Sequence, residues 1–237
     1  MNQRAIKQTV LHALEQNDLE TIVVLARHNR RVLSALIRLA YDKETLVGWR
    51  AIKAIGAAAK ELVNDDEEFL RVTMRKLLWS LSDESGGIGW SAPEILGEIV
   101  SADPNRFREF IPLIAEVFDV EERVFRPGIV YALGRIAETT PERVAGFQKI
   151  VLMSLTDSES LLKVYALILV DRLLDHASSK SLWTEEYKKR ISMIVNNLIN
   201  DEGVAWIYLN DGFYDIEVGE HAKILTEKMK ITAKKEN

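Results

Sequence analysis

A ten-residue phrase occurs twice in this chain. The first copy, VGWRAIKAIG, occupies residues 47–56, and the second, IGWSAPEILG, occupies residues 88–97, an offset of 41 (88 − 47). Six of the ten positions are identical or conservatively replaced. A fixed period near 40 residues is typical of repeat proteins, in which each unit buries its apolar face only against its neighbours. The phrase therefore predicts an architecture, and it leaves the chemistry open.

Composition fits one continuous repeat domain. Of 237 residues, 47% are hydrophobic and 28% are charged, which supplies ample material for a core. The chain has no Cys, so disulfides and thiolate metal sites are excluded. We expect a cytoplasmic protein without a membrane span, because residues 1–15 are already amphipathic and no apolar run is long enough to cross a bilayer.

Charge is unevenly distributed along the chain. Basic and acidic residues number 13 and 10 in residues 1–80, 7 and 13 in residues 81–157, and 11 and 13 in the remainder, for a net charge of −5. An acidic middle repels phosphate. We therefore do not expect nucleic acid as a partner.

Apolar residues recur at helical spacing from Ala5 to about Asn200, and polar breaks separate the runs. Shorter breaks each carry one Asp (Asp42, Asp83, Asp119, Asp157 and Asp201), which we expect to cap the following helix. Each is followed by a helix with a small residue in its middle. This pattern resembles the HEAT repeat, and the resemblance implies an all-α, right-handed solenoid of HEAT-like helix pairs.

The segments from Arg75 to Ile99 and from Gly128 to Ala137 are also similar to one HEAT-like family from sulfate-reducing and related anaerobic bacteria. That family has no assigned function, so the resemblance implies a fold rather than an activity. Pro127 departs from the family pattern, but Pro is tolerated in a first helical turn.

The C-terminus changes character. Residues 204–209 and 213–216 are aromatic and β-branched, and Asn210-Asp211-Gly212 lies between them, which predicts a β-hairpin. We expect HEAT-like repeats over residues 1–203, a hairpin and short capping helix over 204–229, and a frayed basic tail over 230–237. The hairpin is expected to cover the open end of the stack.

Trp49 and Trp90 occupy equivalent places in adjacent repeats, each after a glycine where HEAT units usually carry Arg. The missing side chains of Gly48 and Gly89 would leave room for a partner to approach. Inter-repeat packing is the competing interpretation, and for Trp90 we expect that structural role. The Gly-rich segment 83–89 lacks the Lys and Ser/Thr of a P-loop, and unusual turn geometry explains it without a ligand. The candidate partner or ligand patch comprises Trp49, Arg50, Trp79, Asp83, Glu84, Gly86, Gly87, Gly89 and Trp90.

The sequence identifies no catalytic, metal-binding or cofactor-binding residues. The four His residues are scattered, and no nucleophilic triad can be assembled. The leading interpretation is a non-enzymatic scaffold that binds another protein, serving assembly or maturation of a redox enzyme. The alternatives are an enzyme on a HEAT-like frame, similar to DNA glycosylases or chromophore lyases, and a small-molecule sensor.

Overall fold

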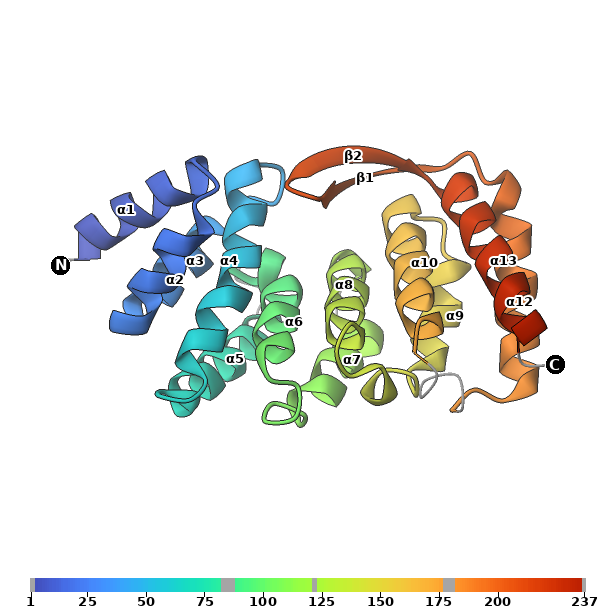
Figure 1. Ribbon diagram of the computed structural model, residues 1–237, viewed down its shortest axis with the longest axis horizontal. Helices are drawn as coiled ribbons and strands as arrows, with labels where there is room; N and C mark the ends of the chain where they lie inside the picture. The colour runs from blue at the N-terminus through green and yellow to red at the C-terminus, as the bar shows by residue number, and fades with distance from the viewer. Residues whose placement is uncertain (1–2, 82–87, 121–122, 177–181, 236–237) are drawn as a thin grey trace.

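Twelve helices in two rows form an extended arc in the computed structural model, which describes residues 3–81, 88–120, 123–176 and 182–235 (Figure 1). One row comprises α1 (Gln3–Glu15), α3 (Arg31–Leu39), α5 (Glu67–Leu81), α7 (Phe110–Val120), α9 (Gln148–Leu155) and α12 (Glu185–Asn197). The second row comprises α2 (Leu19–His28), α4 (Leu46–Leu62), α6 (Ala92–Ala102), α8 (Arg126–Ala137), α10 (Ser160–Leu174) and α13 (Val218–Lys235). Short 3-10 turns are η1 (Ile88–Ser91), η2 (Arg123–Phe125), η3 (Pro141–Arg143) and η4 (Leu198–Asn200).

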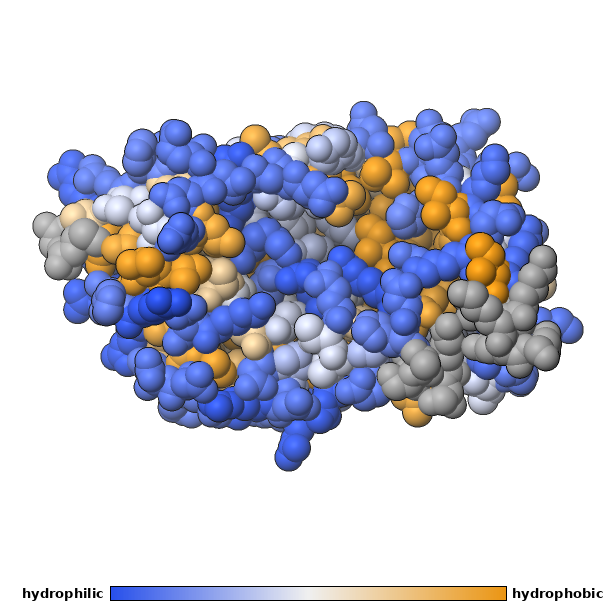
Figure 2. All heavy atoms as spheres, in the orientation of Figure 1, coloured by the Kyte–Doolittle hydropathy of each residue, from blue (hydrophilic) through white to orange (hydrophobic). Residues whose placement is uncertain are grey.

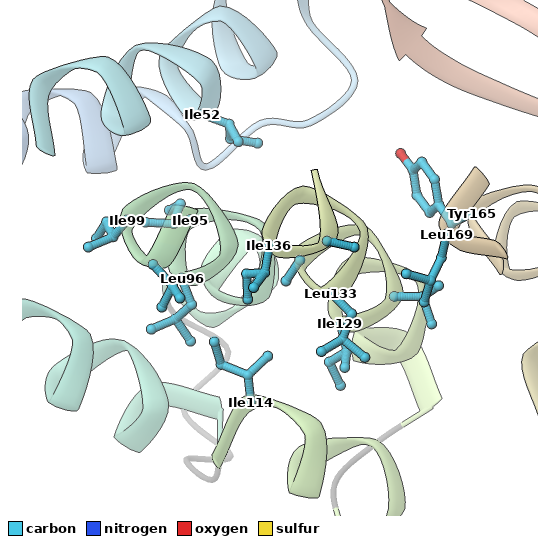
Figure 3. Packing of buried hydrophobic residues seen from close by; sticks show 14 of the residues in the cluster. Ile52, Ile95, Leu96, Ile99, Ile114, Ile129, Leu133, Ile136, Tyr165 and Leu169 are labelled. Atoms are coloured by element: carbon cyan, nitrogen blue, oxygen red, sulfur yellow. The ribbon is translucent and has the colours of Figure 1, made fainter. Parts of the chain in front are cut away.

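The core lies between the rows and along the second row, where successive helices pack directly on one another. Figure 3 shows Ile95, Leu96 and Ile99 of α6 and Ile129, Leu133 and Ile136 of α8 gathered with Ile114 of α7. Helix α6 is buried on all sides over Ala92–Val100, which is why its sequence shows no clear polar face. The expected solenoid of helix pairs is confirmed.

Three of the expected turn Asp residues do not cap the following helix, Asp119 lies within α7 (Phe110–Val120), and Asp83 lies outside the described residues. Asp42, Asp157 and Asp201 each accept a hydrogen bond from the backbone N–H two residues on, at 2.8–3.0 Å. Thr45 caps α4 instead, accepting from the Gly48 N–H at 3.1 Å. An Asx turn orders each of these loops, and the carboxylates of Asp157 and Asp201 also bind a cation from an earlier helix pair, Arg123 and Lys163 respectively.

The predicted hairpin is present as β1 (Val204–Leu209) and β2 (Gly212–Glu217), antiparallel with Leu209 opposite Gly212. Asn210 and Asp211 form the two-residue turn with φ of 48° and 63°, the left-handed geometry that such hairpins require. It lies between α12 and α13 in sequence, so the boundary expected at residue 203 separates two helices that pack together. Helix α13 continues to Lys235 rather than ending near Met229, because residues 230–235 include no Gly or Pro that would end it.

The position of the hairpin differs from expectation. It does not cover the open end of the stack, where α12 and α13 form the last pair. Instead it runs back from α10, passing over α6 and α8 to reach the start of α4 (Figure 1). Ala205 and Ile207 are buried beneath it. The hairpin thus connects helix pairs that a simple solenoid leaves out of contact.

Candidate functional site

The candidate patch divides into two environments. Trp49 and Arg50 lie at the start of α4 beneath the hairpin, whereas Trp79 ends α5 and Gly89 and Trp90 lie in η1. The remaining candidates, Asp83, Glu84, Gly86 and Gly87, fall outside the described residues. The two environments differ in burial and in bonding.

Trp49 is 5% exposed and is held between aromatic rings. Tyr208 of β1 stacks on its indole with ring centroids 5.4 Å apart and planes 4° from parallel. Tyr131 of α8 meets the indole edge-on at 5.3 Å, and Tyr165 of α10 continues the row at 5.7 Å from Tyr131. Offset stacked and edge-to-face pairs are favourable beyond the area they bury. Trp49 therefore joins the second row of helices to the hairpin.

Arg50 fixes the tip of the hairpin. Its guanidinium donates to both oxygens of Asp211, at 2.7 and 3.0 Å, and to the carbonyls of Leu14 and Glu15 at the end of α1. Asn17 donates to the same carboxylate at 2.7 Å. We call Asn17, Trp49, Arg50, Tyr208 and Asp211 the clasp, since together they tie the first helix pairs to the C-terminal hairpin.

The clasp also shifts the pKa values of its own groups. Hydrogen bonds from Arg50 and then Tyr208 hold the pKa of Asp211 below its usual range, although partial burial opposes them. Burial, followed by the hydrogen bond to Asp211, raises the pKa of Tyr208 to about 12. Asp211 is therefore ionised and Tyr208 neutral at neutral pH.

Gly48 does not leave room for a partner, contrary to the expectation from sequence. A Cβ placed there would lie 1.7 Å from the backbone carbonyl oxygen of Asp42. The turn before α4 folds back against the helix at this point, and only a residue without a side chain permits that approach. Gly48 is thus needed for the turn itself.

The second environment is an exposed edge. Trp79 is 71% exposed and Trp90 is 44% exposed, so the expected burial of Trp90 between repeats is wrong. The η1 turn contacts α5 and α6. Its last residue, Ser91, is buried, and the Ser91 hydroxyl donates to the Ala40 carbonyl oxygen at 2.6 Å. Val72 lies seven residues before Trp79 on α5, hence on the same helix face, and is 36% exposed. We call Val72, Trp79 and Trp90 the α5–η1 edge.

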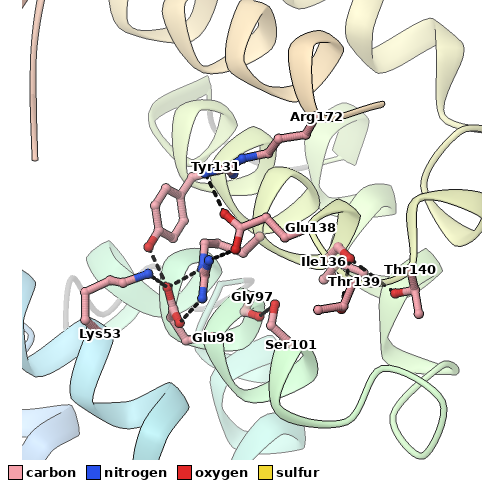
Figure 4. A network of polar contacts seen from close by, with 11 residues as sticks. Lys53, Gly97, Glu98, Ser101, Tyr131, Ile136, Glu138, Thr139, Thr140 and Arg172 are labelled. Carbon is pink, nitrogen blue, oxygen red and sulfur yellow. Dashed lines mark hydrogen bonds and ion pairs between the residues drawn. The ribbon is translucent and has the colours of Figure 1, made fainter. Parts of the chain in front are cut away.

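A charged network crosses the second row of helices (Figure 4). The carboxylate of Glu98 on α6 is 2% exposed and accepts from Lys53 of α4 at 2.8 Å, Tyr131 at 2.6 Å and Arg135 of α8 at 2.8 and 3.2 Å. Arg135 also pairs with Glu138, which binds Arg172 of α10 at 2.6 Å. The network therefore connects α4, α6, α8 and α10, and every carboxylate in it has a cationic partner.

Glu98 stays charged despite its burial. Burial raises its pKa, but Lys53 and Arg135 outweigh that effect and hold the pKa below its ordinary value. Burial and the neighbouring Glu98 raise the pKa of Tyr131 well above its usual range, so its hydroxyl remains a donor. Gly56 of α4 gives the carboxylate its space, because a Cβ there would lie 2.6 Å from a Glu98 oxygen. A carboxylate held in this way is a structural anchor rather than a free acid or base.

Sequence reasoning missed this network. The available signal was Glu94 and Glu98, four residues apart within the apolar run of α6. Glu94 is also buried and is bound by Lys43 at 2.8 Å, while its second oxygen has no hydrogen-bond partner among the residues that the structure describes. Figure 2 shows hydrophilic residues across the middle of one face, between two apolar areas.

Across residues 3–81, 88–120, 123–176 and 182–235, no group of three or more His, Asp or Glu side chains is placed to hold a metal ion. In the same ranges, no helix has both the length and the apolar character needed to cross a membrane.

Comparison with known proteins supports the fold. No family model matches the chain. A protein of Archaeoglobus fulgidus, described as uncharacterized, is 32% identical over 105 residues, which are 44% of this chain and 54% of that protein. The chain thus aligns with about half the length of this relative.

Solved structures of the same architecture align over nearly the whole chain. A designed armadillo repeat protein in complex with the peptide (KR)4 aligns with 97% of this chain and 100% of its own at 13% identity and a TM-score of 0.53. The archaeal HEAT-like repeats protein from Thermococcus onnurineus aligns over 98% of both chains at 16% identity and a TM-score of 0.41. The chain has a HEAT-like or armadillo repeat fold.

Proposed function

We propose that this chain is a non-enzymatic scaffold that binds a partner protein through the α5–η1 edge. The observation that carries the proposal is the exposure of Trp79 and Trp90, at 71% and 44%, on the consecutive elements α5 and η1. Trp49 and Trp183 are 5% exposed each, and the remaining tryptophan, Trp206, is 51% exposed but stacks on Phe213 within the hairpin. Large exposed aromatic side chains are enriched at the centres of protein interfaces, where they fill pockets of the partner.

The charge of the middle of the chain favours a protein over a nucleic acid. Residues 81–157, which include Trp90, have 7 basic and 13 acidic residues, whereas α5, which carries Val72 and Trp79, also carries Arg71, Arg75 and Lys76. The designed armadillo neighbour holds a peptide, so this fold is compatible with binding a polypeptide. We extend the proposal to assembly or maturation of a redox enzyme, an extrapolation from the anaerobic hosts of the family that the sequence resembles.

The alternatives find less support. A glycosylase needs a carboxylate and a basic groove facing DNA, whereas the Glu98 carboxylate is enclosed by Lys53, Arg135 and Tyr131. A sensor that binds between the two Gly-Trp segments would need the space beside Gly48, which the Asp42 carbonyl fills.

Photocrosslinking in the source organism tests the proposal. Benzoylphenylalanine would replace Trp79 in one variant and Trp90 in another. The matched control carries it at Met193 of α12, at the opposite end of the arc, where the side chain is 60% exposed. We expect one discrete adduct shared by positions 79 and 90 and lacking at 193. Adducts that are identical at all three positions, or none at 79 and 90, would reject the α5–η1 edge as a docking surface.

A further inference from the structure

A basic hollow lies between α1 and α3 at the N-terminal end of the arc. It has a volume of about 710 Å³, and its lining includes Arg4 and Lys7 of α1 and Arg31 and Arg38 of α3. Ile6 and Ala35 form an apolar floor, exposed 1% and 7%. No acidic side chain contributes to the lining.

The four cations of this hollow lack acidic partners among the described residues, unlike other cations nearby. Arg27 of α2 pairs with Glu61 of α4, and Arg30 pairs with Asp66, the residue before α5. Helix α3 contains no acidic residue, and the only one in α1 is Glu15 in its last turn. Four neighbouring positive charges without counterions repel one another, and an anionic ligand relieves that repulsion.

The spacing of the cations limits what the hollow holds. Arg4 and Lys7 are three residues apart and Arg31 and Arg38 are seven apart, so each pair lies along one face of its helix. Seven residues of helix span about 10 Å, which equals roughly three residues of an extended peptide. The apolar floor suits an aliphatic side chain between charged ones.

We propose that this hollow binds a short acidic peptide segment of a partner protein, with at least two carboxylates on the cations and one apolar side chain on Ile6 and Ala35. A nucleic acid fits less well, because the basic residues do not continue along the chain and residues 81–157 are acidic. The site is separate from the α5–η1 edge, so either proposal stands without the other.

Fluorescence anisotropy of the full chain tests this site. The probe is a fluorescein-labelled peptide of sequence Glu-Asp-Leu-Glu-Asp-Leu-Glu-Asp. Arg4→Glu with Arg38→Glu should weaken binding by about tenfold or more, since two attractive contacts become repulsive. The control pair Lys189→Glu with Arg190→Glu makes the same charge change on exposed residues of α12 and should alter binding less than about twofold.

Two further binding measurements can overturn the proposed site. If the reversal variant does not fold, Arg4→Gln with Arg38→Gln is compared with Lys189→Gln and Arg190→Gln. An equal loss of peptide affinity in the hollow variant and the control variant would mean that only net charge matters, and would overturn the proposed site. Labelled single-stranded DNA that binds more tightly than the peptide, and loses binding in the same hollow variant, would also overturn the peptide assignment.

Discussion

Trp49 and Trp90 follow glycines in the two copies of one phrase, yet their surroundings differ. Trp49 lies in the first turn of α4, enclosed by Tyr131 and stacked beneath Tyr208 of the hairpin. Trp90 lies in a 3-10 turn before α6 and is 44% exposed. The helices occupy equivalent places in the arc, but Trp49 lies within α4 whereas Trp90 lies in the turn before α6. Tyr208 of the hairpin and Tyr131 of α8 then cover Trp49.

The comparison shows how two copies of one phrase come to lie in different surroundings. In a solenoid each unit contacts its neighbours, so equivalent positions start with similar surroundings. A single segment from outside the repeat pattern changes that. Here the clasp buries Trp49, whereas Trp79 and Trp90 of the α5–η1 edge are 71% and 44% exposed.

The largest expected effect is on stability when each tryptophan is truncated. Trp49→Ala should lower the free energy of unfolding by about 3–5 kcal/mol, because it removes a buried ring and leaves a cavity. Trp90→Ala should lower it by less than about 1 kcal/mol. Urea denaturation followed by circular dichroism measures both. Equal losses for the two variants would contradict the assignment of different roles.

A smaller effect is expected at the glycine before Trp49. Gly48→Ala should cost about 1–3 kcal/mol, since the added Cβ must displace the Asp42 carbonyl from the start of α4. Gly146→Ala is the matched control, because nothing lies within 4 Å of a Cβ at that position. Thermal denaturation should show a lower midpoint for the first variant alone. A tolerated Gly48→Ala would mean that the turn before α4 can move.

The smallest effect concerns the charge at the hairpin tip. Asp211→Asn should reduce the free energy of unfolding by about 1 kcal/mol near neutral pH, since the charge-assisted bonds from Arg50 become neutral ones. Asp215→Asn, an exposed change on β2, should have little effect.

The difference in unfolding free energy between wild type and Asp211→Asn depends on pH through the pKa of Asp211. The folded-state pKa lies below the unfolded value of about 3.9, so the ionised carboxylate stabilises the fold above that value. As the pH falls below about 4 and through the folded pKa, this stabilisation is lost, and wild type and Asp211→Asn should converge. Denaturation between pH 7 and pH 3 checks this, and a constant difference over the whole range would argue against the Arg50–Asp211 bond.

The sequence predicted the fold more fully than the site. The repeated phrase and the Asn-Asp-Gly turn were sufficient for the solenoid and the hairpin, because both depend on local patterns of polarity and turn residues. The clasp was not predictable in this way. Asp211 is 161 residues from Arg50 and 194 from Asn17, and no local pattern specifies which distant helix a hairpin tip meets.

The charged network shows a second limit. From its residue type alone, Glu98 is expected at the surface, and its burial depends on cations that two other helices supply, Lys53 of α4 and Arg135 of α8. Trp90 shows the converse. An aromatic residue at this repeat position was expected to be buried between repeats, but its side chain is partly exposed to solvent. In both cases, the environment is set by packing between elements that are distant in sequence.

Fluorine NMR of 5-fluorotryptophan-labelled protein tests the central claim most directly. The five tryptophan resonances are assigned by single Trp→Phe variants, and a soluble paramagnetic agent then reports the exposure of each ring. We predict that the Trp49 resonance resists broadening while that of Trp90 broadens, and that Tyr208→Ala makes Trp49 sensitive without changing Trp90. Broadening of the Trp49 resonance as strong as that of Trp90 in the wild-type protein, or broadening of Trp49 that Tyr208→Ala leaves unchanged, would contradict the account.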